Sequence, residues 1–357
     1  MLSVEGYMLL NYIIHYSLRA VNILIASFRG VFSLPGGRKG SPQVVRRQYL
    51  LYNVSKTQTR KGCAGMDWIK LARPRHWIKN LLVFAALVFS GRLTEGAAVL
   101  RCLWAALLFC AASSAVYIFN DICDAPADAL HEVKRTRPIA SGRIKPGSAW
   151  VVFGVLTAAL LAAAFFAVKS PQLTLLLAAY IAMNVLYSLV FKRVPLLDVC
   201  ILVAGFLIRL LCGGAVIDQP VSPWLYLTVM ALSFFVGLGK RRNELRRLGS
   251  RAEDVRGVLK FYTPEFLDKN MYMCMCAAVV FYALWTVLGR PGGDTHLVWT
   301  TPLALIICMK YSLTIERSDW ADPVDVLIGD KVMLALVVLF AVIIAAVLYG
   351  GKILGAA

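Results

Sequence analysis

The sequence lacks the cysteine and histidine patterns that mark zinc sites and disulfide frameworks. Its nine cysteines form no CxxC pair and show no Cys/His ligand spacing, and the chain holds only four histidines. We therefore infer neither a zinc site nor a disulfide scaffold. Most of the cysteines lie in or beside apolar runs, where cysteine behaves as a small hydrophobe. These are Cys102, Cys110, Cys200, Cys212, Cys274, Cys276 and Cys308.

Acidic residues are also scarce, at 20 Asp and Glu against 38 Lys and Arg, so the net charge is +18. On a soluble chain this excess would suggest a nucleic-acid partner. However, 59% of the residues are hydrophobic and the mean hydropathy is +0.68, which excludes an ordinary soluble enzyme and predicts a polytopic membrane protein. Because the positive charge lies in short loops between apolar segments, we expect it to set the topology and bind phosphates, and we expect no nucleic acid.

A clean secretory signal is absent from residues 1–65. No basic region precedes the apolar run 7–28, and no small-residue cleavage site is obvious. A much more coherent sequence opens at Met66. We expect residues 1–65 to be an N-terminal extension outside the functional core, or a mis-called start, and residues 66–357 to form the functional domain.

From Met66 onward, nine apolar segments reach or approach the length of about 20 residues that crosses the hydrocarbon. They lie at roughly 77–91, 98–119, 150–168, 173–190, 196–217, 224–239, 271–288, 298–315 and 332–350. The even-numbered connections carry 18 Lys and Arg residues, and the odd-numbered ones carry three. The positive-inside rule then places the even-numbered connections in the cytoplasm. The sequence predicts an all-α bundle of nine transmembrane helices in the cell (inner) membrane, with its active face cytoplasmic.

The stretch NDICDAPADALHEVKRTRPIASG, residues 120–142, directly follows the second apolar run. It opens with four oxygen-bearing side chains, those of Asn120, Asp121, Asp124 and Asp128. The i, i+3, i+7 spacing of the aspartates puts them on one face of a helix, although Pro126 should kink or end that helix. Carboxylates beside hydrocarbon need a neutralising partner. Mg²⁺ can be that partner, because it binds carboxylate oxygens together with waters and the oxygens of substrate phosphates. We interpret the stretch as a magnesium–diphosphate site, and the alternative is a solvated connector.

Further polar clusters fall on the same predicted face. Lys79 and Asn80 begin the first span, where the alternative is an ordinary basic membrane flank. Tyr187 and Lys192 lie between the fourth and fifth spans, shortly before Asp198. The candidate substrate contacts among them are Lys79, Asn80, Tyr187 and Lys192.

Lys240 and Arg241 follow the sixth span and are also candidate substrate contacts. They are not part of a P-loop, because the strand, the spacing and the Ser or Thr are absent. A cluster at 322–331 is either part of the site or a turn with a helix cap. Arg209, within the fifth span, should point into the bundle towards a carboxylate or an anionic ligand. Nearby Gly205, Gly213 and Gly214 would allow close helix packing.

The segments RPRHWIKN, NDICDAPAD and HEVKRTRPIASG together resemble the UbiA superfamily of intramembrane prenyltransferases. More narrowly, they are similar to the branch that includes decaprenyl-phosphate phosphoribosyltransferase, and the resemblance runs from about Met66 to the C-terminus. It implies a nine-helix bundle around a lipid-accessible cavity. It implies metal and diphosphate contacts by Asn120, Asp121, Asp124 and Asp128. It also implies phosphate contacts by Lys79, Lys134, Arg137 and Lys192.

One departure from the prenyltransferase members bears on the substrate. Those members carry a second Asp-rich motif after the sixth span, where this chain has the mostly basic Lys240-Arg241-Arg242-Asn243-Glu244. A basic cluster suits a second anionic substrate better than a second metal. We hypothesise Mg²⁺-dependent transfer of 5-phosphoribose from phosphoribosyl diphosphate to a polyprenyl (decaprenyl-type) phosphate, releasing diphosphate, for synthesis of a cell-envelope glycolipid precursor.

The catalytic residues of this hypothesis are Asp121, Asp124 and Asp128. The lipid phosphate needs no general base, because a phosphate monoester has its second pKa near about 6, and His131 would have a structural or phosphate-contact role. The acidic-loop motif of soluble phosphoribosyl diphosphate enzymes is absent. Two alternatives stay open, namely prenyl transfer from prenyl diphosphate to an aromatic acceptor and transport of organic anions, although no internal repeat typical of transporters is seen. The sequence is compatible with a homo-oligomer.

Overall fold

A computed structural model describes residues 64–130, 134–249, 256–289, 295–318, 320 and 322–354. Throughout these residues the regular secondary structure is helical. Nearly all of the predicted N-terminal extension, residues 1–65, lies outside the described residues, so that part of the domain division stays a prediction.

Eight helical segments are long and apolar enough to cross a membrane. They are α5 (Gly96–Asp128), α6 (Pro146–Ala162) continued by η4 (Ala163–Ala167), α7 (Pro171–Leu189), α8 (Leu197–Val216), α9 (Pro223–Leu248), α11 (Pro264–Leu288), η8 (Thr295–Thr300) continued by α12 (Thr301–Arg317), and α14 (Lys331–Leu354). They coincide with the second to ninth predicted spans. The prediction of an all-α polytopic membrane protein is therefore confirmed.

The first predicted span is mostly 3₁₀ helix and not a continuous α-helix. After α3 (Ala64–Ala72), the tightly wound 3₁₀ helix η2 (Pro74–Phe84) leads into one turn of α-helix, α4 (Ala85–Phe89). Proline fits the first position of η2 because its missing N–H would have no partner there. At about 2.0 Å per residue in η2 and about 1.5 Å in α4, the segment is about 30 Å long, close to the hydrocarbon thickness. A ninth crossing is thus compatible with the geometry, whereas the eight longer segments meet the length criterion directly.

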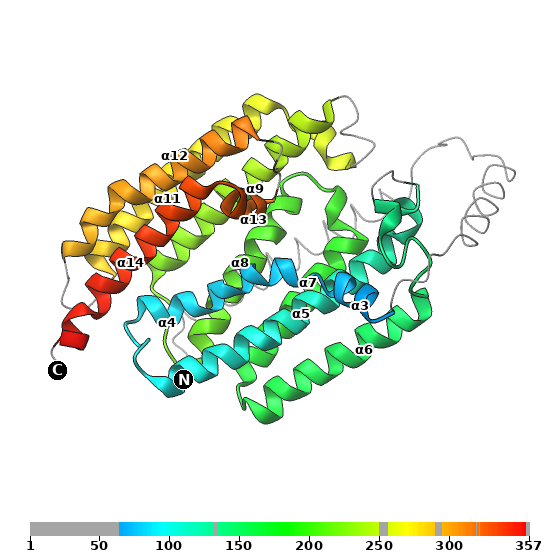
Figure 1. The fold of residues 1–357 in the computed structure, drawn as a ribbon, viewed down its shortest axis with the longest axis horizontal. Coiled ribbons are helices and arrows are strands. Elements are labelled where there is room, and N and C mark those ends of the chain that lie inside the picture. Colours follow the sequence, from blue (N-terminus) through cyan, green and yellow to red (C-terminus); the bar gives the residue numbers. More distant parts are fainter. Residues whose placement is uncertain are drawn as a thin grey trace, which may run out of the picture. The chain divides into compact units, whose positions relative to one another are not determined.

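Two helices lie at the centre of the described bundle. In their most apolar windows α5 and α8 each bury 61% of residues, whereas α6 buries 17% and α14 buries 22%. One hydrophobic core joins α5, α6 and α7 to α8, and a second joins α8 to α9, α11, α12 and α14. Figure 1 shows α11, α12 and α14 running side by side, with α5 and α6 adjacent to each other on the opposite flank. Because α8 contributes to both cores, its side chains face the interior on two sides.

Gly213 allows α8 to approach η2 very closely. A Cβ atom at this position would lie 1.9 Å from the backbone oxygen of Val83, which no side chain could tolerate. The predicted role of Gly213 in close packing is confirmed. This contact holds the start of the first span against α8, so Asn80 on η2 lies next to Arg209 on α8.

Short helices lie at the end of the bundle where α5, α7, α9 and α12 finish. They are η3 (Lys134–Thr136), η5 (Phe191–Arg193), η7 (Gly257–Phe261) and α13 (Pro323–Gly329). Since consecutive spans alternate in direction, these connections come to one end, and most of the predicted site residues lie on them or on the neighbouring ends of the helices. The even-numbered connections thus share one face, while the assignment of that face to the cytoplasm stays a prediction.

Candidate active site

Asp121 and Asp128 form a buried acidic pair near the end of α5. The Arg137 guanidinium donates to both, at 3.2 Å from Asp121 and 2.6 Å from Asp128. Arg73, which directly precedes η2, also donates to Asp121 at 2.6 Å. The side chains of Asp121 and Asp128 are only 3% and 6% exposed, so these arginines supply the neutralising charge that buried carboxylates need.

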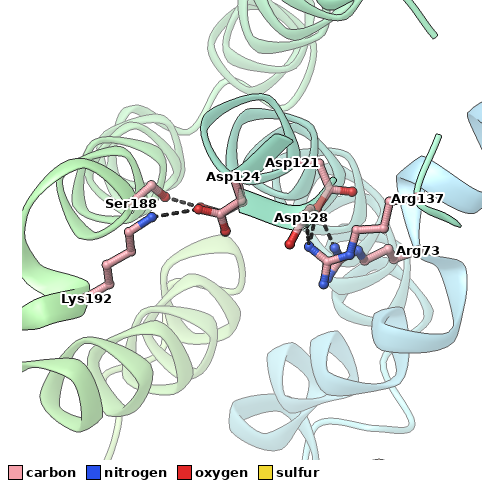
Figure 2. Close-up of polar contacts among 8 residues, drawn as sticks. Arg73, Asp121, Asp124, Asp128, Arg137, Ser188 and Lys192 are labelled. Carbon is pink, nitrogen blue, oxygen red and sulfur yellow. Dashed lines mark hydrogen bonds and ion pairs between the residues drawn. The ribbon is translucent and has the colours of Figure 1, made fainter. Parts of the chain in front are cut away.

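Asp124 points away from that pair, as Figure 2 shows. Its carboxylate accepts from Lys192 of η5 at 2.6 Å, and its side chain remains 36% exposed. One turn earlier, the Asn120 side-chain oxygen accepts from the Ser188 hydroxyl at the end of α7. At about 100° per residue, positions 121 and 128 lie about 20° apart around the helix, while position 124 lies about 60° from 121. That offset directs Asp124 to η5, while Asp121 and Asp128 reach the segments that hold Arg73 and Arg137.

The helix also continues further than its sequence indicated. Pro126 lies inside α5, which ends at Asp128, so all three aspartates are helical and none lies in an irregular turn. Proline removes one hydrogen bond to the preceding turn, and the helix ends two residues later. The expected single acidic face is therefore divided between two sets of basic partners.

Magnesium needs oxygen ligands that are accessible, and this requirement separates the four residues of the acidic stretch. No group of three or more His, Cys, Asp or Glu side chains is gathered for metal binding in the described ranges. Magnesium usually needs one or two protein carboxylates, because waters and substrate phosphates complete its coordination. Asp124, which stays accessible, and Asn120, which faces a cavity, supply the oxygen donors that fit this requirement. Asp121 and Asp128 are held by arginines, so their predicted role as metal ligands stays a prediction.

A polar cavity of about 260 Å³ lies beside the end of α5. Its lining includes five of the predicted contacts, which are Lys79, Asn120, Tyr187, Lys240 and Arg241. Arg209 and Arg256 also line it, so among the described residues five basic side chains face the cavity. Asp198 is the one carboxylate in this lining, and two carboxylates outside it, Glu244 and Asp322, pair with lining bases. This surplus of positive charge makes the cavity suited to anions carrying several negative charges.

Asp322 does not line this cavity, but it contacts two lysines that do. Its carboxylate accepts from Lys79 at 2.9 Å and lies 3.5 Å from Lys240. The other carboxylate oxygen accepts from the backbone N–H of Val324 and so caps α13. The cap alternative for the 322–331 cluster is thus correct, and the same side chain also contacts two cavity lysines.

Burial alone would raise the pKa of Asp322, but the two lysines and the helix-cap hydrogen bond outweigh it and lower the pKa to about 2. A depressed carboxyl pKa stabilises the fold above the unfolded value of about 3.9, and this stabilisation is lost as the pH falls through about 2. Asn at this position keeps the cap and removes the charge. We expect Asp322→Asn to lose about 2 kcal/mol of stability at neutral pH relative to the wild type.

Unfolding of the two proteins in detergent micelles, measured at pH values from 8 down to 3, tests this expectation. The difference in the free energy of unfolding between wild type and Asp322→Asn should be constant at high pH and shrink as the pH falls below about 4. A difference that does not change with pH would show that the two lysines do not stabilise the ionised Asp322.

Arg241 is held in a buried network and has little freedom to move towards a ligand. It donates to Asp198 at 2.6 Å and to Glu244 at 3.0 Å, and its side chain is 3% exposed. The second oxygen of Asp198 accepts from the Tyr262 hydroxyl at 2.6 Å. Burial, reinforced by that hydrogen bond, raises the pKa of Tyr262. The network ties α8, α9 and the segment after η7 together beneath the cavity.

Asn80 is fully buried and does not line the polar cavity. Its side-chain oxygen accepts from Arg209 at 2.8 Å and from Ser113 at 3.3 Å. In this arrangement Asn80 positions Arg209, and its predicted direct contact with substrate stays untested. The prediction that Arg209 points into the bundle agrees with its place on the cavity wall.

Lys134 lies on η3, outside the set of cavity-lining residues, and His131 lies outside the described residues. Three residues that contact the acidic pair or the polar cavity were not among the predicted site residues: Arg73, Asp322 and Arg256. Arg73 lies 48 residues from its partner Asp121, and Asp322 lies 243 residues from Lys79. No local spacing in the sequence signals such pairings, although all three residues stand in the basic or acidic clusters near span ends.

Comparison with known proteins agrees with this geometry. The sequence matches the model of the UbiA prenyltransferase family over residues 81–325. Decaprenyl-phosphate phosphoribosyltransferase of Mycolicibacterium smegmatis is 33% identical over 295 residues, covering 79% of this chain and 92% of that protein. The protein of the same name from Mycobacterium tuberculosis is 32% identical over 289 residues, covering 79% and 94%. A solved UbiA homolog from Archaeoglobus fulgidus, bound to GPP and Mg²⁺, has a TM-score of 0.61 at 20% identity, covering 78% and 99%.

The helical bundle, the family match and the relatives together define an integral membrane transferase. The chain belongs to the UbiA prenyltransferase family. The resemblance seen in its motifs is therefore confirmed, both for the family and for its likeness to decaprenyl-phosphate phosphoribosyltransferases.

Proposed function

We propose that the protein transfers 5-phosphoribose from phosphoribosyl diphosphate to a polyprenyl phosphate of the decaprenyl type, releasing diphosphate. The observation that carries this proposal is the polar cavity, whose five basic side chains outnumber, among the described residues, the three carboxylates that pair with four of them, Asp198, Glu244 and Asp322. Two substrates that both carry phosphate bring more negative charge than a prenyl diphosphate with an aromatic acceptor, so they suit such a surplus better. The names of the relatives from Mycolicibacterium smegmatis and Mycobacterium tuberculosis support the same reaction.

An apolar cavity of about 490 Å³ adjoins the polar one and supports a lipid acceptor. The two cavities share four lining residues, namely Lys79, Phe206, Val236 and Pro323. The apolar walls come mainly from η2, α4, α9 and α13. A polyprenyl chain in the apolar cavity would place its phosphate close to Lys79, at the boundary between them.

The reaction needs positioning and charge more than proton transfer. The bond between ribose C1 and the diphosphate oxygen breaks, and its electron pair leaves with diphosphate. A phosphate oxygen of the lipid forms the new bond to C1. That oxygen is already ionised near neutral pH, since the second pKa of a phosphate monoester is about 6, so no base has to remove a proton.

Individual residues have separate roles in this proposal. Asp124 and Asn120 would hold Mg²⁺, which when bound neutralises the leaving diphosphate. Lys192 lies beside Asp124 and would contact the same diphosphate. Lys79 and Lys240 would fix the other phosphates, and burial of the reactants excludes water that would otherwise hydrolyse the donor. The face carrying these residues would be cytoplasmic in the inner membrane, where water-soluble phosphorylated donors are found.

An assay that follows labelled phosphoribosyl diphosphate and measures the diphosphate released tests the reaction. We expect membranes containing the protein to move label from phosphoribosyl diphosphate into the lipid phase only when polyprenyl phosphate is added, and to release one diphosphate per transfer. Membranes from cells without the gene are the control. If the lipid stays unlabelled while prenyl diphosphate and an aromatic acceptor are consumed, the alternative function, prenyl transfer, is correct.

A further inference from the structure

Arg209 carries a buried positive charge for which the described structure offers no carboxylate. The residue is 7% exposed and lies in the middle of α8, within the membrane-spanning bundle. Asp198, Glu244 and Asp322 pair with the other four basic residues that line the polar cavity. In the described chain Arg209 is thus the cavity's one basic side chain without a carboxylate within ion-pair distance.

The contacts of Arg209 hold its guanidinium in place without neutralising it. It donates to the side chain of Asn80 at 2.8 Å and to the backbone oxygen of Gly205 at 2.7 Å. Its other two hydrogen bonds to side chains are longer, at 3.3 Å to Ser113 and 3.2 Å to the Tyr180 hydroxyl. The guanidinium also lies over the faces of three aromatic rings, those of Phe109, Tyr180 and Phe206. Neutral acceptors and ring faces offset only part of the cost of burying a cation.

The position of Arg209 along α8 shows which part of the cavity it serves. Asp198, at the start of α8, lines the same cavity and lies 11 residues earlier. At about 1.5 Å per residue, Arg209 is about 16 Å further along the helix, so it lies at the inner end of the cavity. On α5, Asn120 lines the same cavity, and the diphosphate is proposed to bind beside it, next to Asp124 and Lys192.

We propose that Arg209, with the hydroxyl of Tyr180 beside it, binds a phosphate monoester group at the inner end of the polar cavity. A phosphate dianion would supply the missing negative charge, and arginine suits it because its N–H groups match phosphate geometry. The group has two sources, the 5-phosphate of the donor and the phosphate of the lipid acceptor. The choice between these sources rests on the proposed function.

Binding measurements on the full-length protein in nanodiscs test this site. The probes are ribose 5-phosphate, farnesyl phosphate and pyrophosphate, and the variant is Arg209→Gln. We expect one phosphate monoester to bind about tenfold more weakly to the variant, equivalent to about 1.4 kcal/mol, while pyrophosphate binding stays within about twofold of wild type. Loss for ribose 5-phosphate identifies the donor group, and loss for farnesyl phosphate identifies the lipid group.

A pair of variants at Ser113 tests the same site even if Arg209→Gln does not fold. Ser113 lies on α5, 3.3 Å from Arg209, and does not line the cavity. Ser113→Asp would give Arg209 an internal carboxylate, and Ser113→Asn is the neutral control of the same size. We expect the Asp variant to bind the same phosphate monoester about tenfold more weakly than the Asn variant.

Three binding results would overturn the proposal. They are failure of wild type to bind either monoester, equal loss of all three probes in Arg209→Gln, and equal affinities within the Ser113 pair. The proposed transfer reaction has a separate readout. If wild type binds a monoester through Arg209 but transfers no phosphoribosyl label, the site stands and the proposed reaction fails. If label is transferred with unchanged KM values in Arg209→Gln, the reaction stands and the site fails.

Discussion

Replacing Asp124 by alanine is expected to reduce kcat by at least about 100-fold, the loss typical when a group that stabilises developing charge is removed. Asp124 is the carboxylate of the acidic stretch that remains accessible, at 36% exposure, while Asp121 and Asp128 are enclosed by arginines. Turnover in membranes, measured with the labelled donor and polyprenyl phosphate, gives the result.

Two comparisons make the Asp124 test specific. Glu265→Ala removes an exposed carboxylate from the first turn of α11 and should leave kcat unchanged within about twofold. Asp124→Asn keeps one oxygen donor, so its residual activity should require more Mg²⁺ than wild type does. Full activity of Asp124→Ala at low Mg²⁺ concentration would show that this carboxylate does not bind the metal.

Replacing Arg241 by methionine is expected to destabilise the fold by about 3–5 kcal/mol, because it leaves Asp198 buried without its principal partner. The Asp198 side chain is 0% exposed and accepts from Arg241 at 2.6 Å. Unfolding in mixed micelles with increasing denaturant measures the loss. The double variant Arg241→Met with Asp198→Asn should recover part of it, because the unpaired carboxylate is then absent.

The control for Arg241 is another arginine in an ion pair, at the surface. Arg75 pairs with Asp325 at 2.6 Å, and their side chains are 66% and 36% exposed. Arg75→Met should therefore cost at most about 1 kcal/mol. If Arg241→Met is no less stable than Arg75→Met but binds substrate more weakly, Arg241 is a substrate contact, as its sequence suggested, and not a structural residue.

The spans were predictable because each must bury or face hydrocarbon over nearly its whole length. Runs such as 196–217 and 332–350 agree closely with α8 (Leu197–Val216) and α14 (Lys331–Leu354). The sixth predicted span stopped at residue 239, whereas α9 continues to Leu248. The polar end of α9 carries no hydrophobic signal, since it is held by ion pairs such as the one between Arg241 and Asp198.

The candidate site was predictable in its residue types and less so in its pairings. The sequence identified Asp121, Asp124, Asp128 and Arg137 through the density of charge beside an apolar run. It identified Lys192 through a polar cluster between the fourth and fifth spans. It did not indicate that Asp121 and Asp128 would pair with Arg137 while Asp124 pairs with Lys192. Those pairings depend on which neighbouring segment each side chain reaches, and a rotation of about 60° on α5 decides between them.

By itself, the sequence determined the membrane-spanning helices, the shared end of the polar connections and the location of the acidic stretch, because hydrophobic length and local charge density are properties of consecutive residues. Only the tertiary structure decided which charges neutralise one another. Ion pairs such as Lys79–Asp322 join residues 243 positions apart, and the same structure leaves Arg209 with neutral partners alone among the described residues. Charge balance in a low-dielectric interior depends on distances of a few ångströms between helices, and those distances are set by packing contacts such as that of Gly213 with Val83.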